Sequence, residues 1–333
     1  MLKKPVRILL WIIGLFLLGA LVHQLGVSLV VDRVRALGWN IVPVLSIAML
    51  WHTSNTLAWR ACFDRDDPDR PGFWWLVYIK LAGEAVGNVT PASHLSGEVA
   101  KVYILRPKIS ATRGLPSLVV NKTIEVISGL FFAVLGTVLA FQLLEIDEQI
   151  RLGLILALGM SSLAIGLVFL GQRRNTFEWF LDLLLRLKIT FLEKRRAQIQ
   201  ETDRNIAAFY RRNPRGFIES FVLHVFSWIF GTFEIYYILI TLGEPVTFTT
   251  ALLLASLSTI ITTAFFFVPS GLGVFEGGHA FLFHLLGLDP VLGLSVGLIR
   301  RIRKVFWVAI GFGLMTVYRQ PRDPPVSLEA PSP

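Results

Sequence analysis

The sequence predicts an all-α polytopic membrane protein with about six full transmembrane helices and two oppositely oriented re-entrant helical hairpins. Of its 333 residues, 54% are hydrophobic and only 17% are charged. Several apolar runs approach or exceed the roughly 20 residues that cross a bilayer core. Two other apolar stretches are broken by Gly, Pro and charged residues, which lipid-exposed backbone does not tolerate. We therefore expect a single integral membrane domain over residues 1–318 and a disordered, Pro-rich tail over 319–333.

Six apolar runs account for the expected full spans. They cover residues 8–25, 41–61, 116–143, 152–171, 217–242 and 291–318, with approximate ends. Lys3, Lys4 and Arg7 precede the first run, and no small-residue cleavage site follows it, which indicates an uncleaved span with a cytoplasmic N-terminus. Arg319 and Arg322 follow the last run, so the same rule places the C-terminus in the cytoplasm.

The first broken stretch covers residues 73–106 and is flanked by basic residues on both sides. If both ends are cytoplasmic, the segment enters the membrane and returns, which predicts a re-entrant hairpin with its tip near Pro91 and Gly97. The candidate polar residues on it are Lys80, Glu84, Asn88, Glu98 and Lys101. The alternative is a pair of amphipathic helices lying on the membrane surface.

The second broken stretch interrupts the apolar run over residues 249–286. Its expected tip residues are Pro269, Gly271, Gly273 and Gly277. Glu276 follows Pro269 by seven residues, as Glu98 follows Pro91. This similarity suggests an internal repeat. Opposed broken hairpins form the midplane sites of inverted-repeat transporters.

Basic residues fall within the last apolar run, at Arg300, Arg301, Arg303 and Lys304. Arg300 lies about 13 Å from the start of that run at the helical rise per residue. Each charge at this depth costs about 2.5–3.5 kcal/mol unless it is offset, so we expect Glu276, Glu98, Glu234 or a bound anion nearby. Arginine forks fit phosphate oxygens. The alternative is that the basic run ends a span at the cytoplasmic surface.

The longest polar stretch, residues 172–215, carries more basic than acidic residues. Apolar residues recur at helical spacing at Phe180, Leu184, Leu187 and Phe191, which predicts an amphipathic helix at the cytoplasmic interface. A solvated loop is the alternative. Within the preceding span 116–143, Lys122 and Glu125 are three residues apart and can pair on one face.

Several function classes find no support in the sequence. The single cysteine, Cys62, excludes an internal disulfide framework. No metal-ligand spacing, nucleophile elbow or Walker motif is present, so we expect no metal, no cofactor and no ATP hydrolysis by this chain. The net charge of +9 agrees with the positive-inside rule, and we expect no nucleic acid partner.

Three segments together resemble a known family. They are GEAVGNVTPASHLSGEVAKVYILR (83–106), VVNKTIE (119–125) and VPSGLGVFEGG (268–278), and Arg300 follows them after an apolar run. They are similar to the lysylphosphatidylglycerol synthase transmembrane region, also called the flippase-like integral membrane family. The resemblance implies a bacterial inner-membrane protein that moves or exposes lipids, or serves a lipid-modifying system; a branch associated with hopanoid biosynthesis has a similar length. The synthases carry an aminoacyl-transferase domain that is not expected here, so lysylphosphatidylglycerol synthesis is not implied.

The leading functional hypothesis is translocation of an amphipathic lipid with a polar or anionic headgroup through a midplane polar cavity. Glu98 and Glu276 would lie at the hairpin tips, and Arg300, Arg301 and Lys304 would contact the headgroup. The cytoplasmic half of the path would be lined by Lys80, Glu84, Asn88, Lys101 and Lys122. No catalytic motif is recognisable, so the sequence favours a role other than an enzyme and leaves enzymatic activity as an alternative. The alternatives are a lipid-linked transferase with a carboxylate base, or a non-transporting component of a lipid-biosynthetic complex.

Overall fold

The computed structural model describes residues 35, 37–90, 93–173, 178, 182, 186, 196–264 and 274–317. Within this part of the chain all regular secondary structure is helical. The side chains of residues 93–95, 264 and 274–276 are not described. The predicted first span and the tail lie outside the described residues. So do eight positions that the sequence analysis singled out: Pro91, Phe180, Leu184, Leu187, Phe191, Pro269, Gly271 and Gly273.

Four helices in the described ranges are long and apolar enough to cross a membrane. They are α3 (Ile41–Ala61), preceded by the short η1 (Gly38–Asn40), α6 (Ala111–Leu143), α7 (Glu148–Gln172) and α10 (Pro214–Thr241). Each coincides with a predicted span, and α3 has the predicted bounds. The apolar runs therefore identified these four elements correctly.

The start of α6 differs from the prediction, because Pro116 lies inside the helix instead of at its beginning. Proline has no N–H, so it cannot donate to the carbonyl four residues earlier, which belongs to Thr112. In the structure the side-chain amide of Asn205 donates to that Thr112 carbonyl at 2.7 Å. The acceptor that Pro116 leaves without an intrahelical partner is satisfied by α9 (Arg196–Arg212).

The last helix, α13 (Pro290–Val317), continues without a break through Arg300–Lys304. Its bounds agree with the predicted run within one residue. The basic residues fall near the middle of the helix, with Arg300 about 15 Å from its first residue at the helical rise. The alternative, in which a span ends at the basic run and a separate segment follows, is therefore not what the structure shows.

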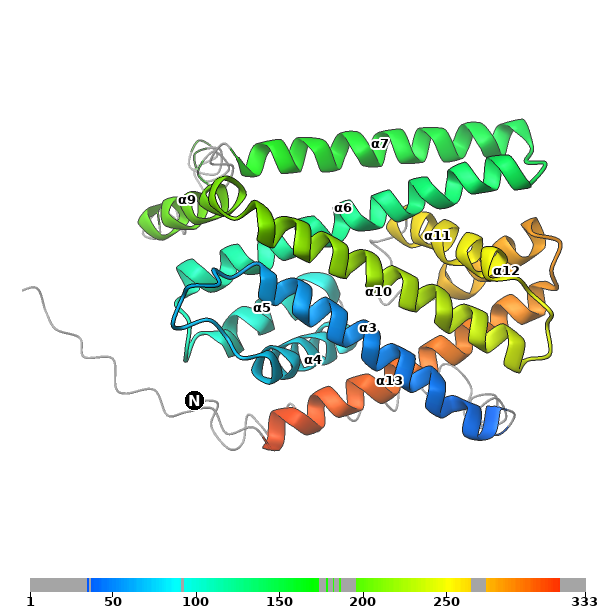
Figure 1. Cartoon of the computed structure of the whole chain (residues 1–333), viewed down its shortest axis with the longest axis horizontal. Helices are drawn as coiled ribbons and strands as arrows, with labels where there is room; N and C mark the ends of the chain where they lie inside the picture. The colour runs from blue at the N-terminus through cyan, green and yellow to red at the C-terminus, as the bar shows by residue number, and fades with distance from the viewer. Residues whose placement is uncertain are drawn as a thin grey trace, which may run out of the picture.

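Both broken stretches form pairs of shorter helices. The first pair is α4 (Phe73–Val89) and α5 (Ser93–Leu105), and the second is α11 (Phe248–Ala264) and α12 (Val274–Leu285). Figure 1 shows the long helices running along the length of the molecule, with the two pairs toward opposite ends. Thr90 ends α4 in an extended conformation, so the chain turns there.

Glycines set the distances between these elements. A Cβ at Gly97 would lie 2.9 Å from the carbonyl oxygen of Gly83, so α4 and α5 pack more closely than larger residues would allow. Gly311 of α13 lies against Leu81 of α4, and Gly136 of α6 lies against Ser256 of α11, where added Cβ atoms would overlap those neighbours. The contact of α4 with α13 thus resembles that of α11 with α6.

These two contacts are related in sequence. The difference in residue number between Leu81 and Ser256 equals that between Gly136 and Gly311. The same difference relates Phe73 to Phe248, the first residues of α4 and α11. The pair α4–α5 thus contacts α13 at Gly311, and the pair α11–α12 contacts α6 at Gly136. Matched contacts of this kind are expected of an internal repeat.

The remaining helices surround this centre. Only Gln172 is buried in α7, and many of its apolar side chains are exposed, among them Leu152, Met160 and Leu167. The amphipathic helix α9 packs against α6 through Ile206 and Ala207 and exposes Arg204, Arg211 and Arg212. Tyr210 of α9 donates to Gln172 at 2.7 Å, which ties this helix to the end of α7.

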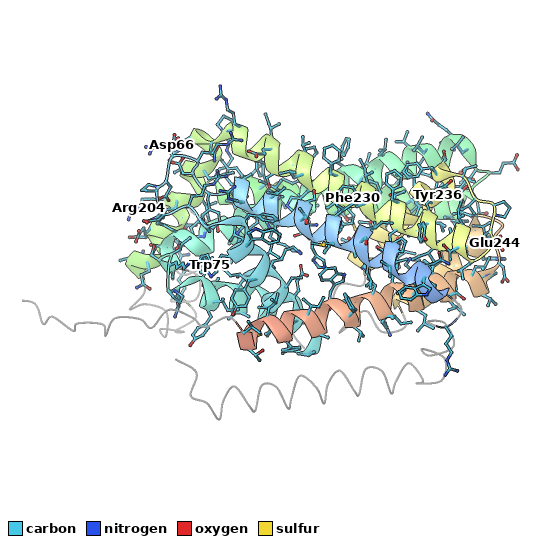
Figure 2. All side chains as sticks on the ribbon, turned by 60° about the horizontal axis from the view of Figure 1, so that its bottom comes forward. Asp66, Trp75, Arg204, Phe230, Tyr236 and Glu244 are labelled. Atoms are coloured by element: carbon cyan, nitrogen blue, oxygen red, sulfur yellow. The ribbon has the colours of Figure 1, made fainter. Side chains whose placement is uncertain are left out.

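The two ends of the molecule differ in charge. Figure 2 shows Asp66 and Arg204 at one end and Tyr236 and Glu244 at the other. Basic residues gather at the first end in the segment 106–113 and along α9, beside the aspartates of the connection 62–72, whereas the turn 144–148 and residues Glu244 and Asp289 make the other end acidic. This asymmetry is the one that the positive-inside rule associates with a cytoplasmic and an external face.

Candidate functional site

Six charged side chains on three helices form what we call the Lys/Glu cluster. It consists of Lys80 and Glu84 on α4, Glu98 and Lys101 on α5, and Lys122 and Glu125 on α6. Each helix supplies one lysine and one glutamate, three or four residues apart, so that both side chains lie on the same face. Five of the six were predicted as site residues, and the structure brings all five together.

Every ion pair in this cluster lies within one helix. Lys80 donates to Glu84, Lys101 Nζ lies 2.7 Å from Glu98 Oε1, and Lys122 Nζ lies 3.0 Å from Glu125 Oε2. The charges also act between helices, since Lys80 is influenced by Glu125 and Lys122 by Glu98. Each helix therefore carries a neutral pair, and the three pairs meet in the interior.

His52 joins the cluster from α3. Its Nδ1 lies 3.2 Å from Lys80 Nζ and 3.4 Å from Glu84 Oε2. The imidazole packs against the indole of Trp307 on α13, with ring centroids 4.7 Å apart, and Lys80 lies 4.5 Å from the ring centroid of Trp51. Sequence reasoning missed His52; the available signal was an ionisable residue within an otherwise apolar span.

Polar contacts from α10 support the part of α6 that carries Lys122 and Glu125. His224 of α10 lies fully buried, with its Nε2 3.1 Å from Asn121 Oδ1. Trp228, one turn further along α10, donates to Ser128 Oγ at 3.1 Å. These contacts fix the face of α6 that carries Lys122 and Glu125.

The arginine–glutamate cluster consists of Glu234 on α10 with Arg300 and Arg303 on α13. Arg303 Nη1 donates to Glu234 Oε2, and Arg300 Nε lies 3.7 Å from Glu234 Oε1. On its other side, Arg300 Nη1 lies 3.5 Å from Nε2 of His279, which belongs to α12. The cluster thus joins three helices, and the charge of Arg303 also acts on His52 of the neighbouring Lys/Glu cluster.

The other predicted residues of α13 are placed differently. Arg301 is buried on a different face from the arginine–glutamate cluster, and Lys304 is exposed. The sequence prediction placed Lys304 with Arg300 and Arg301 at the headgroup, whereas the ion pairs with Glu234 are made by Arg300 and Arg303. The side chain of Glu276 lies outside the described residues.

The expected hairpin-tip and path residues also differ in role. Gly97 lies inside α5 and packs on Gly83, so its role is close helix packing and not formation of the tip. Gly277 is exposed in α12. Asn88 donates its side-chain amide to the Glu84 carbonyl at 2.8 Å, within the last turns of α4. Glu98 lies one turn into α5, close to the break that follows Thr90.

The described residues offer charge and hydrogen bonding within a helix bundle. In the described ranges, no three His, Cys, Asp or Glu side chains are arranged to hold a metal ion. The arrangement of lysines, glutamates and arginines can instead solvate a polar or charged group where lipid would not.

Comparison with known proteins assigns the chain to a family. Residues 6–313 match the family model described as the lysylphosphatidylglycerol synthase TM region. A UPF0104 membrane protein, PH1989 of Pyrococcus horikoshii, is 22% identical over 337 residues, covering 94% of this chain and 97% of the relative. No solved structure matches the chain. The chain is therefore a multi-pass membrane protein that belongs to the family of the lysylphosphatidylglycerol synthase TM region.

Proposed function

We propose that this protein translocates an amphipathic lipid with a polar or anionic headgroup between the two leaflets of a membrane. The observation that carries this proposal is the convergence of three Lys/Glu pairs from α4, α5 and α6 inside the helix bundle. Charged side chains at membrane depth are costly and occur mainly where they line a polar path. A headgroup that crosses the bilayer needs such a path, whereas its acyl chains can remain in lipid.

The exposure of the three lysines supports a path that narrows inward. The Lys122 side chain is 43% exposed, that of Lys101 is 12% exposed, and that of Lys80 is 8% exposed. Because each lysine has its counter-ion on the same helix, α4, α5 and α6 can separate without leaving a charge unpaired. A headgroup can then contact lysines and glutamates in succession as it moves between the helices.

The proposed membrane placement follows from the two helix pairs and the charge asymmetry. In it, α4–α5 enters from the cytoplasmic side and α11–α12 from the external side, both as re-entrant hairpins. The arginine-rich end with α9 faces the cytoplasm, together with both termini, in a bacterial inner membrane. This arrangement follows the inverted-repeat principle, in which opposed broken helices enclose a midplane site.

The test is lipid scrambling by purified protein in proteoliposomes. A fluorescent lipid is placed in both leaflets, and dithionite bleaches only the lipid that reaches the outer leaflet. We expect bleaching well beyond the outer-leaflet half with the native protein and near-background rates with Glu276→Gln and Arg300→Ala. Arg204→Ala is the matched control, because Arg204 is an exposed arginine on α9.

Folding of each variant is checked by thermal unfolding in detergent. If folded Glu276→Gln and Arg300→Ala scramble at the native rate, these residues are not part of the path. Bleaching that stops at the outer-leaflet half with the native protein contradicts translocation. Mass spectrometry of the lipid that co-purifies distinguishes a hopanoid substrate from an aminoacyl-phospholipid substrate. The identity of that lipid also shows whether a lipid-biosynthetic enzyme must make it before transport.

A further inference from the structure

Glu234 is a buried carboxylate at the centre of the arginine–glutamate cluster. Its side chain is 1% exposed, whereas those of Arg300 and Arg303 are 17% and 19% exposed. It lies on α10 and both arginines lie on α13, so these ion pairs join two helices. The exposed fraction of this cluster therefore belongs to the arginine side chains, and the carboxylate is its most deeply buried member.

The contacts of Glu234 constrain how the arginines are oriented. Arg303 donates through Nη1 to Glu234 Oε2, and Arg300 Nε lies 3.7 Å from Glu234 Oε1, an ion-pair contact longer than a hydrogen bond. A guanidinium carries five N–H donors in a planar fork, so a carboxylate that holds one Nη donor restricts the directions in which the other donors point. The remaining donors of Arg303 can meet the oxygens of an anion on the accessible side.

The charge of the cluster also depends on Glu234. One carboxylate and two guanidinium groups carry a net charge of +1, and loss of the carboxylate would raise it to +2. At low dielectric constant, an added charge changes the attraction for an anion strongly. The Lys/Glu cluster differs, because each of its helices carries a neutral pair.

We propose that Glu234 is the positioning residue of an anion-binding site formed by Arg300 and Arg303, and that it limits how tightly this site holds a phosphate ester. This inference rests on the proposed translocation of a lipid and assigns the phosphate of its headgroup to this cluster. Glu234 orients the guanidinium groups, and its negative charge weakens their hold on the anion so that the headgroup is released. A site without this carboxylate would bind the headgroup and retain it.

The first test separates binding from transport with Glu234→Gln, which keeps the size of the side chain and one carbonyl oxygen but removes the charge. The probe is dihexanoyl phosphatidylglycerol, titrated into purified protein in detergent and followed by calorimetry. We expect about tenfold tighter binding than native and slower scrambling in proteoliposomes. Dihexanoylglycerol, which lacks the phosphate, is the control and should show no difference between variant and native protein.

Two further variants keep the inference testable if Glu234→Gln does not fold. Arg303→Gln should weaken binding of the phosphatidylglycerol probe at least tenfold. Glu234→Asp keeps the charge but shortens the side chain; it should bind the probe within about threefold of native and scramble more slowly, because the guanidinium groups are no longer held in place. If Glu234 had only a structural role, Glu234→Gln would not bind the phosphatidylglycerol probe more tightly than the native protein does.

The outcomes separate this inference from the proposed function. Equal or weaker probe binding by folded Glu234→Gln, or native binding by Arg303→Gln, overturns the anion site even when the native protein scrambles lipid. If Glu234→Gln binds the probe more tightly than the native protein does, and the native protein does not scramble lipid, the anion site is upheld and translocation is contradicted. Equal binding of both probes by the native protein excludes a phosphate-specific site.

Discussion

Replacing Lys80 with methionine tests whether the interior pairs depend on mutual neutralisation. Lys80 is 8% exposed and donates to Glu84, whose other close partner is His52 Nδ1 at 3.4 Å. Methionine keeps most of the aliphatic volume but leaves the glutamate charge without its lysine. Removing one partner of a buried pair typically costs about 3–5 kcal/mol. Because Glu84 is partly accessible and retains His52, we expect a loss of about 3 kcal/mol in the free energy of unfolding.

Lys122→Met is the matched control, since it removes the same residue type from a pair of similar spacing. The Lys122 side chain is 43% exposed and that of Lys80 is 8% exposed, so the Lys122–Glu125 pair is the less desolvated of the two. We expect a smaller loss in the free energy of unfolding than for Lys80→Met. The double variant Lys80→Met/Glu84→Leu should recover most of the stability lost in Lys80→Met, because it removes both charges together.

The assay is unfolding by sodium dodecyl sulfate in mixed micelles, followed by far-ultraviolet circular dichroism. Equal losses in Lys80→Met and Lys122→Met would show that burial of the pair does not determine its contribution. A double variant that is less stable than Lys80→Met would show that Glu84 stabilises the fold independently of the lysine. Either result would refute the reasoning.

Two further predictions concern helix packing and orientation. Gly136→Leu should unfold at a lower temperature than the native protein, because a side chain there overlaps Ser256, whereas Gly153→Leu on α7 meets no atom within 4 Å and should leave the melting temperature unchanged; equal melting temperatures would contradict the close α6–α11 contact. In intact cells, Glu244→Cys should react with a membrane-impermeant maleimide and Asp66→Cys should not, and the reverse pattern would invert the proposed orientation.

The span boundaries could be predicted because they depend on local composition. The apolar run over residues 41–61 became α3 with the same bounds, and the last run became α13 within one residue. Pro116 shows the limit of this reasoning. A proline in that position suggests a helix start, but Asn205, far away in the sequence, satisfies the carbonyl of Thr112 and lets the helix begin earlier.

The candidate site was predictable in part for the same reason. The Lys80–Glu84 and Lys122–Glu125 pairs are local, so helical spacing reveals them. Glu234 was expected as one of three carboxylates that could offset the basic run. Its pairing with Arg303 and the role of His52 depend on contacts between helices that are distant in sequence. The sequence prediction also placed Lys304 with Arg300 and Arg301 at the headgroup, and only the packing of α13 against α10 shows that Arg300 and Arg303 pair with Glu234.

Photo-crosslinking with a lipid that carries the reactive group on its headgroup tests the central claim most directly. The probe is reconstituted with native protein, activated, and located by peptide mass spectrometry. We expect adducts on α4 and α5 between Lys80 and Lys101 and on α13 near Arg300, because the headgroup passes among these helices. Adducts confined to the outward-facing surface of α7 would mean that lipid only surrounds the bundle, which would contradict the account.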